Sequence, residues 1–270
     1  MNIRKEYKYL IPNQYLDIIR KELLPYVYPD KYVNNNGKDS YSVRSIYFDT
    51  GKMNYYHEKL AGLEIRKKFR IRGYENTGKN SIIFLEVKRK DNEFVTKNRA
   101  PIYYYHLHDF ILTGNSSKFI HQNCDFDNAV KSANTFLYYL NKKYLVPIVL
   151  VIYDREPFYS KYNFDLRITI DKNIKSKVCT SMANLFSQHK STCCLRGYFV
   201  LEVKFIYGYP LWLKRILQKF NLTRNAVSKY CISVDKHKSE IEMLFKHSSI
   251  EFSQSIFDRK HLLYQEVLAN

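Results

Sequence analysis

One stretch of the chain alternates cations and apolar residues at every second position. Between residues 63 and 74 four cations share one parity: Arg66, Lys68, Arg70 and Arg72. Ile65, Phe69 and Ile71 have the opposite parity. Successive side chains of a β-strand point to opposite faces, so the stretch predicts a strand with cations on one face and apolar residues on the other.

The same alternation returns in later stretches of the sequence. Its polar members are Glu86 and Lys88, Lys97 and Arg99, Arg167 and Asp171, and Glu202 and Lys204. A solvated outer face of a half-buried sheet explains any one of these strands. Like charges opposite each other on neighbouring strands destabilise a sheet, so several cation-rich strands together indicate a missing anion.

The composition of the chain agrees with an anionic partner. Its 270 residues include 44 Lys and Arg against 26 Asp and Glu, a formal charge of +18. Such an excess weakens the compact state unless an anion is present, be it nucleic acid, a membrane surface or a phosphorylated metabolite or polymer. Single-strand nucleic-acid binders place aromatic rings among their cations, whereas Phe69 has the apolar parity, so we expect no nucleic acid.

Short motifs and cysteine usage bear on chemistry and location. The chain lacks a complete P-loop, because Asn80 and not Ser or Thr follows its Gly-x-x-x-x-Gly-Lys at 73–79, and it has no Gly-x-Gly-x-x-Gly. Side chains and not a glycine-rich loop should therefore bind phosphate. Five cysteines without Cys-x-x-Cys spacing favour reduced thiols. The start of the sequence does not resemble a secretory signal, and no apolar run reaches membrane-spanning length. We therefore expect a soluble, cytoplasmic protein.

Periodicity and turn residues predict mostly antiparallel strands with a few helices. The expected strands are 5–11, 41–48, three between 63 and 103, 146–158, 165–171, 198–206 and 228–234. The expected helices are 12–24, 125–145, 210–220 and the region from 238 onward. Turns near 76–79 and 91–92 favour antiparallel pairing. We predict a domain over residues 1–235 and a C-terminal helical extension over 236–270 packed on it.

The order of motifs repeats along the chain. Arg-Ile-Arg precedes Leu-Glu-Val-Lys in the first half, and Leu-Arg-Ile-Thr-Ile-Asp precedes a second Leu-Glu-Val-Lys. Two similar halves that face each other in a closed barrel, with the charged faces inward, would explain this order. Chance repetition of a short motif explains it equally well.

Six ordered motifs resemble the vacuolar transporter chaperone (VTC) domain, the polyphosphate polymerase branch of the CYTH-like triphosphate tunnel metalloenzymes. They are RKEYKYLI at 4–11, SVRSIYFDT at 42–50, RIRGY at 70–74, YDREPF at 153–158, LEVKF at 201–205 and SKY at 228–230. The resemblance implies an α+β fold, an antiparallel tunnel barrel of about eight strands with helices outside. It also implies that ATP or another nucleoside triphosphate donates its γ-phosphoryl group to a growing polyphosphate chain, assisted by Mn²⁺ or Mg²⁺.

The resemblance assigns roles to individual residues. The implied phosphate ligands are Lys8, Arg70, Arg72, Lys88, Lys97, Arg155, Arg167, Lys204 and Lys229, and the alternation adds Lys68 and Arg99. The residues expected to act in catalysis are Arg70, Arg72, Arg155, Arg167 and Lys204. Glu202 is the implied metal carboxylate, with Glu86 and Glu6 as weaker metal ligands of the same parity.

Two departures from the family pattern leave the activity open. Arg4 replaces the first Glu of the Glu-x-Glu-x-Lys pattern of related triphosphatases, which leaves one fewer metal carboxylate. Ala226 occupies a position where polymerase members often carry Lys, with Arg224 close by as a substitute. The sequence therefore predicts a polymerase, a triphosphatase of the same superfamily, or a binding module whose active site has lapsed. A separate membrane partner is also compatible with the family.

Overall fold

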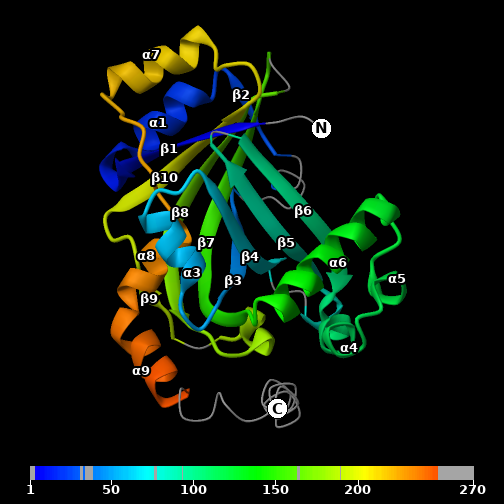
Figure 1. The fold of residues 1–270 in the computed structure, drawn as a ribbon. Coiled ribbons are helices and arrows are strands. Elements are labelled where there is room, and N and C mark those ends of the chain that lie inside the picture. The colour runs from blue at the N-terminus through cyan, green and yellow to red at the C-terminus, as the bar shows by residue number, and fades with distance from the viewer. Residues whose placement is uncertain are drawn as a thin grey trace.

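The computed structural model contains a single curved antiparallel sheet. It describes residues 4–30, 33, 39–75, 78–92, 94–162, 165–188 and 190–248. Its strands are β1 (Lys5–Pro12), β2 (Val27–Pro29), β3 (Tyr41–Asp49), β4 (Ile65–Tyr74), β5 (Ile82–Asp91), β6 (Phe94–Tyr103), β7 (Val146–Ser160), β8 (Arg167–Val178), β9 (Thr192–Cys193) and β10 (Tyr198–Phe205). The order along the sheet is β1-β10-β8-β7-β3-β4-β5-β6, with β2 on β7 and β9 on β8 (Figure 1).

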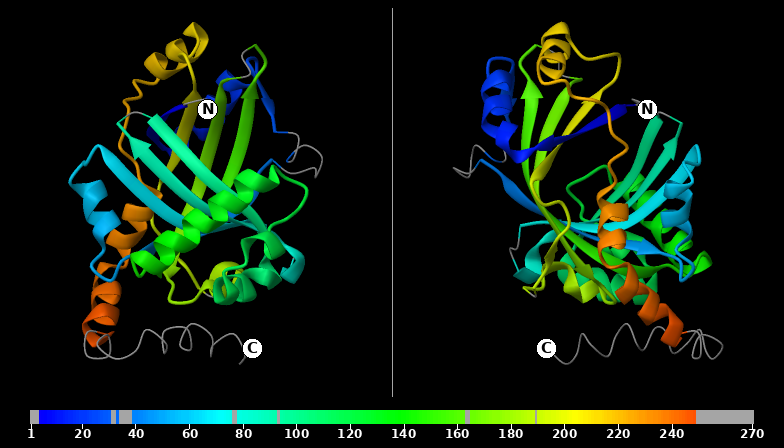
Figure 2. Two further views of the ribbon diagram at one scale, coloured as in Figure 1. Left: turned by 45° about the vertical axis from the view of Figure 1, so that its right-hand side comes forward. Right: turned by 90° about the vertical axis from the view of Figure 1, so that its left-hand side faces the viewer.

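The sheet curls until its two edges approach each other. An isolated antiparallel bridge joins Arg4, beside the first residue of β1, to Val95 of β6. Figure 2 shows β1 returning toward the β5–β6 side across the open side of the curl. The expected α+β fold, an antiparallel tunnel barrel with helices, is confirmed.

Helices cover the convex face and the ends of the sheet. The α-helices are α1 (Leu16–Leu23), α3 (Asn54–Leu60), α4 (Leu107–Thr113), α5 (Ser116–Phe119), α6 (Phe126–Lys142), α7 (Leu211–Lys219), α8 (Lys229–Lys236) and α9 (Lys238–Ser248). Short 3-10 turns are η1 (Asn13–Tyr15), η2 (Gly78–Asn80), η3 (Tyr104–His106) and η4 (Met182–Phe186). No helix among the described residues has both the length and the apolar character that a membrane crossing requires.

The apolar parity of the strands faces outward into two cores. Phe69 and Ile71 of β4 lie in one core with Phe136 of α6, the helix that crosses the sheet in Figure 1. Gly73 of β4 has no side chain because a Cβ there would lie 2.5 Å from Cζ of Phe186 in η4. The second core packs α1 and α7 on β1, β8 and β10. Because both cores are on the convex side, the charged parity faces the concave side.

Residues 228–234, which we predicted to be a strand, belong to the helix α8. Oγ of Ser228 accepts a hydrogen bond from the backbone N–H of Cys231 at 3.2 Å, the standard contact at a helix start. Tyr230 and Val234 are buried in a third core with Val151 and other concave-face residues. The prediction was wrong because Tyr, Ile and Val favour strands locally, whereas tertiary packing at helical spacing decides the structure here.

A buried carboxylate ties α8 to the neighbouring α3. Asp49, fully buried at the end of β3, accepts hydrogen bonds from the backbone N–H groups of Tyr55 and Tyr56 at 3.0 and 2.9 Å. It also accepts one from the hydroxyl of Tyr230 at 2.6 Å. One side chain therefore fixes the start of α3 and the position of α8.

The last described helix, α9, packs on the same domain. Ile241 of α9 is buried in the same core as Val234, while residues 249–270 of the expected extension lie outside the described residues. The division at residue 235 stays a prediction. Residues 76 and 77 of the first expected turn also lie outside the described residues.

Candidate functional site

Strand parity brings the predicted cations together on the concave face. The decisive contact joins strands that do not pair: Nζ of Lys88 on β5 lies 2.9 Å from Oε2 of Glu6 on β1. Lys68 of β4 likewise reaches across the interior, where its ammonium donates to Oγ of Ser228 at 2.7 Å. The charged faces of opposite walls therefore meet inside the curl.

A buried carboxylate, Glu86 of β5, gathers the cations of one wall. Nε and Nη2 of Arg70 each lie 2.6 Å from its Oε2. Nε of Arg99 and Nζ of Lys97 lie 3.3 and 3.4 Å from its Oε1. Burial by itself would raise the pKa of Glu86, but Arg70 and the neighbouring cations hold that pKa well below its ordinary value.

Hydroxyl groups on neighbouring strands accept hydrogen bonds from Arg70 and from Arg72, both on β4. Nη1 of Arg70 donates to the hydroxyl of Tyr47 at 3.0 Å, and Nε of Arg72 donates to Oγ of Ser45 at 3.0 Å. Nη2 of Arg72 donates to the hydroxyl of Tyr153 at 3.2 Å. Burial opposes ionisation of Tyr47, but Arg70, Arg72 and Lys68 outweigh it and lower its pKa to about 7. Sequence reasoning missed Ser45 and Tyr47, although their spacing of two inside SVRSIYFDT is a usable signal.

A second ion-pair group lies on β7 and β8. Nε and Nη2 of Arg155 donate to the two oxygens of Asp171 at 2.7 and 2.8 Å. Nζ of Lys229, in the first turn of α8, lies 2.6 Å from Oδ2 of the same carboxylate. Arg167 differs from these residues, since its guanidinium pairs with Asp30 at 3.2 Å, after β2. Arg167 therefore pairs with a carboxylate outside the groups formed around Glu86, Asp171, Glu6 and Glu202.

Lysines and glutamates make up the wall formed by β1 and β10. Nζ of Lys8 lies 3.0 Å from Oε1 of Glu6 and 3.9 Å from Oε2 of Glu202. Nζ of Lys204 lies 2.6 Å from Oε1 of Glu202. Burial opposes the charge of Lys8, yet Glu6 and Glu202 together raise its pKa. No carboxylate among the described residues forms an ion pair with Lys68, and burial together with Lys8 and Lys88 lowers its pKa to about 8.

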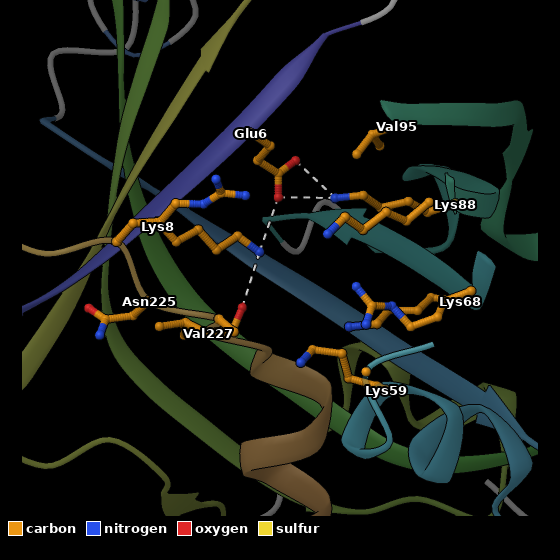
Figure 3. A pocket seen from close by; sticks show the side chains of 13 residues that line it. Glu6, Lys8, Lys59, Lys68, Lys88, Val95, Asn225 and Val227 are labelled. Atoms are coloured by element: carbon orange, nitrogen blue, oxygen red, sulfur yellow. Dashed lines mark hydrogen bonds and ion pairs between the residues drawn. The ribbon is translucent and has the colours of Figure 1, made fainter. Parts of the chain in front are cut away.

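A pocket of about 390 Å³ opens beside this wall (Figure 3). It is lined by predicted ligands, Lys8, Lys68 and Lys88, and by Glu6. Four more cations line it that the sequence did not assign as ligands: Lys59, Arg66, Lys90 and Arg224. The sequence places Arg66 on the charged face of its strand and offers Arg224 only as a substitute for the Lys expected at position 226. No sequence signal pointed to Lys59, which lies on α3.

The sequence profile of the VTC domain matches residues 3–238. The chain belongs to the VTC domain family. No curated protein matches the chain.

Solved structures similar to this VTC domain include a putative adenylyl cyclase from Hippeastrum, described as having a dominant triphosphatase activity. It shares 11% sequence identity at a TM-score of 0.43, over 87% of this chain and 96% of that one. A chain of the Schizosaccharomyces pombe Mediator head module shares 7% identity at a TM-score of 0.40, over 81% of this chain and 91% of that one. At these values neither structure supports an inference on activity.

The family also implies a divalent metal in this VTC domain, and the donor set allows a test of fit. Among the described residues no three His, Cys, Asp or Glu side chains converge as a metal site. Glu6 and Glu202, on paired strands, both contact Lys8. Mg²⁺ commonly binds through one or two carboxylates plus substrate phosphates, so this pair fits a metal that arrives with a triphosphate. Glu86 fits less well, because three cations already surround its carboxylate.

Proposed function

We propose that this VTC domain transfers the γ-phosphoryl group of a nucleoside triphosphate, ATP in the first instance, to a polyphosphate chain held inside the curled sheet. One observation carries the proposal: cations from opposite walls converge on one interior, as the Lys88–Glu6 contact between β5 and β1 shows most directly. The carboxylates that pair with these cations balance their charge inside the protein. Phosphate oxygens are also anionic acceptors and can form the same charge-assisted hydrogen bonds with Arg and Lys.

The proposed chemistry makes modest demands on the protein. Phosphoryl transfer needs the reacting oxygens in line and the negative charge neutralised, and most of the catalysis is positioning and electrostatics. Arg70, Arg72 and Arg155 present planar forks that fit two phosphate oxygens, whereas Lys8, Lys88 and Lys204 present single ammonium groups. The acceptor oxygen of a polyphosphate end is already ionised, so no general base is assigned.

Glu202, with Glu6, is proposed to hold the divalent metal. A bound Mn²⁺ or Mg²⁺ would neutralise phosphate charge and raise the electrophilicity of the transferred phosphorus. Lys8 and Lys204 lie against these carboxylates and balance their charge when no phosphate is present. With a metal held by these carboxylates, the same two lysines would be free to contact phosphate oxygens.

Turnover with ATP and Mn²⁺ tests the proposal. Purified protein is incubated with both, and the products are separated on a gel stained for polyphosphate while free phosphate is measured in parallel. Chains that lengthen with time support the polymerase. Free phosphate without chains identifies a triphosphatase, and tight polyphosphate binding without either product identifies a lapsed binding module, for which Ala226 in the pocket wall is the supporting observation.

The cytoplasm is the proposed location. All five cysteines are unpaired thiols, which suits a reducing compartment that also holds ATP. A separate membrane partner stays part of the proposal.

A further inference from the structure

The four additional pocket cations form a group of their own at the pocket mouth. Lys59 comes from α3, Arg66 from β4, Lys90 from β5, and Arg224 from the segment between α7 and α8. We call these four residues the mouth cluster. Figure 3 shows the pocket with Lys59 below Lys68 and Lys88.

Three members of the mouth cluster differ from the interior cations in their charge balance. Interior cations such as Arg70, Lys88 and Arg155 each lie within salt-bridge distance of a carboxylate. Within the part of the chain that the structure describes, Lys59, Arg66 and Lys90 form no ion pair. Arg224 places its guanidinium 3.9 Å from the ring centroid of Tyr7.

The strand register adds repulsion inside the mouth cluster. Arg66 and Lys90 are directly opposite on β4 and β5, and the next pair on the same face is Lys68 opposite Lys88. Like charges directly opposite on a sheet are destabilising. Burial, followed by the charges of Arg66, Arg224 and Lys59, lowers the pKa of Lys90. The chain therefore keeps a self-repelling group at the mouth, and an anion from outside would relieve the repulsion.

The pocket makes the mouth cluster continuous with the interior. Lys8, Lys68 and Lys88 line the same cavity as Arg66 and Lys90. On β4 and β5 the cations are spaced two residues apart and so share one strand face. The Arg66–Lys90 pair of the mouth cluster is therefore next to the Lys68–Lys88 pair of the interior. A linear polyanion held by the interior lysines would continue along this face.

We propose that the mouth cluster is a second polyphosphate subsite, which binds the part of the chain beyond the phosphates held in the interior. The inference rests on the proposed function and adds selectivity for chain length: long-chain polyphosphate binds more tightly than tripolyphosphate. None of the described residues that line the pocket is aromatic, whereas single-strand nucleic-acid sites stack bases on aromatic rings, and this favours polyphosphate as the ligand.

The test compares two ligands on matched variants. Arg66→Gln/Lys90→Gln removes two charges from the mouth cluster, and Lys131→Gln/Lys175→Gln removes two exposed charges elsewhere. Calorimetric titration at one ionic strength measures binding of tripolyphosphate and of long-chain polyphosphate. The mouth variant is expected to bind the long chain about tenfold more weakly or worse, and tripolyphosphate within about twofold of wild type. The exposed-lysine control should bind both ligands as wild type does.

Thermal unfolding of the ligand-free mouth variant gives a second readout. Arg66 and Lys90 lie directly opposite each other on paired strands, so removing both charges removes a repulsion. The melting temperature should therefore be equal to or above that of wild type. A marked fall would assign these cations a structural role and overturn the inference. So would equal losses of both ligands, unchanged binding of the long chain, or single-stranded DNA that binds as tightly as polyphosphate and depends equally on the mouth cluster.

An interior variant separates failure of this inference from failure of the proposed function. Arg70→Lys should weaken both ligands, because both use the interior. If wild type binds tripolyphosphate through Arg70 but gains nothing from a longer chain, the mouth subsite is wrong and the interior site stands. If Arg70→Lys leaves both ligands unchanged, the proposed function loses its site.

Discussion

The interior has an arginine region and a lysine region, and they hold their charges differently. Arg70 and Arg155 bind fully buried carboxylates, and their side chains are only 14% and 8% exposed. Lys8, Lys88 and Lys204 contact Glu6 and Glu202 through one nitrogen each, and their side chains are 21%, 25% and 26% exposed. The arginines are fixed by planar contacts, whereas the lysines retain freedom to turn.

This difference matches two demands of the proposed reaction. The donor triphosphate must be held in one orientation so that its phosphorus is in line with the acceptor. The acceptor chain must shift after each addition. We infer that the arginine region orients the donor and that the lysine region, continued by the mouth cluster, holds the chain that moves. The predictions below test this division.

Glu202→Gln is expected to have the largest effect. It removes a proposed metal carboxylate but no cation, so turnover of ATP should be abolished while polyphosphate still binds. Release of products and calorimetric binding are measured side by side. Glu242→Gln, on an exposed position of α9, is the matched control and should behave as wild type. Turnover that survives in the Glu202 variant would contradict the metal assignment.

Asp171→Asn is expected to have the next largest effect, a loss of stability in the arginine region. It leaves Arg155 and Lys229 buried without their shared charge, and breaking a buried ion pair commonly costs ~3–5 kcal/mol. Chemical denaturation measures the free energy of unfolding. Glu6→Gln should cause a clearly smaller loss, because Lys8 keeps Glu202 nearby and Lys88 is partly exposed. Equal losses would remove the distinction between the regions.

Exchange of the two cation types sharpens the comparison further. Arg70→Lys keeps the charge but loses the fork, so tripolyphosphate affinity should fall about tenfold or more, in line with ~1.5–3 kcal/mol for a charge-assisted contact. Lys88→Arg should keep affinity within about threefold, since a single-point contact tolerates either cation. Dissociation constants from titration decide the point. The division fails if both exchanges cost the same.

The smallest expected effect is on pH dependence. Burial lowers the pKa of Lys68 and of Lys97 to about 8, so both are charged below that pH and lose charge above it. Tripolyphosphate affinity should therefore fall a few-fold between about pH 7 and about pH 9. Lys68→Arg stays charged and should flatten this fall, while the ionisation of the ligand is the same for both proteins. An identical pH profile for the two proteins would contradict the role of Lys68.

Much of the architecture could be predicted from short-range pattern. The parity of β4 follows from alternate residues, and packing of Phe69 and Ile71 in the outer core confirms the orientation of its charged face. The helix α6 follows from its apolar spacing. The family could be inferred from six short motifs and their order along the chain, which rules of periodicity do not describe. These features depend on residues close together in the chain or on their order.

The partners inside the sheet could not be predicted in the same way. Lys88 and Glu6 are 82 residues apart, and Lys68 and Ser228 are 160 apart. Such contacts depend on strand order and curl, which local patterns do not determine. Lys59 joins the pocket only because α3 folds back beside β4. The helix α8 was missed for the same reason, since its buried face is defined by strands that lie far away in sequence.

The buried carboxylate of Asp49 couples two parts of the molecule mechanically. It accepts hydrogen bonds both from the backbone at the start of α3 and from the hydroxyl of Tyr230 on α8. Lys59 is carried by the first helix and Lys229 by the second. Because Asp49 bonds to both helices, we expect a displacement of one helix to be transmitted to the other. Lys59 in the pocket and Lys229 beside Asp171 would then move together along the proposed phosphate path.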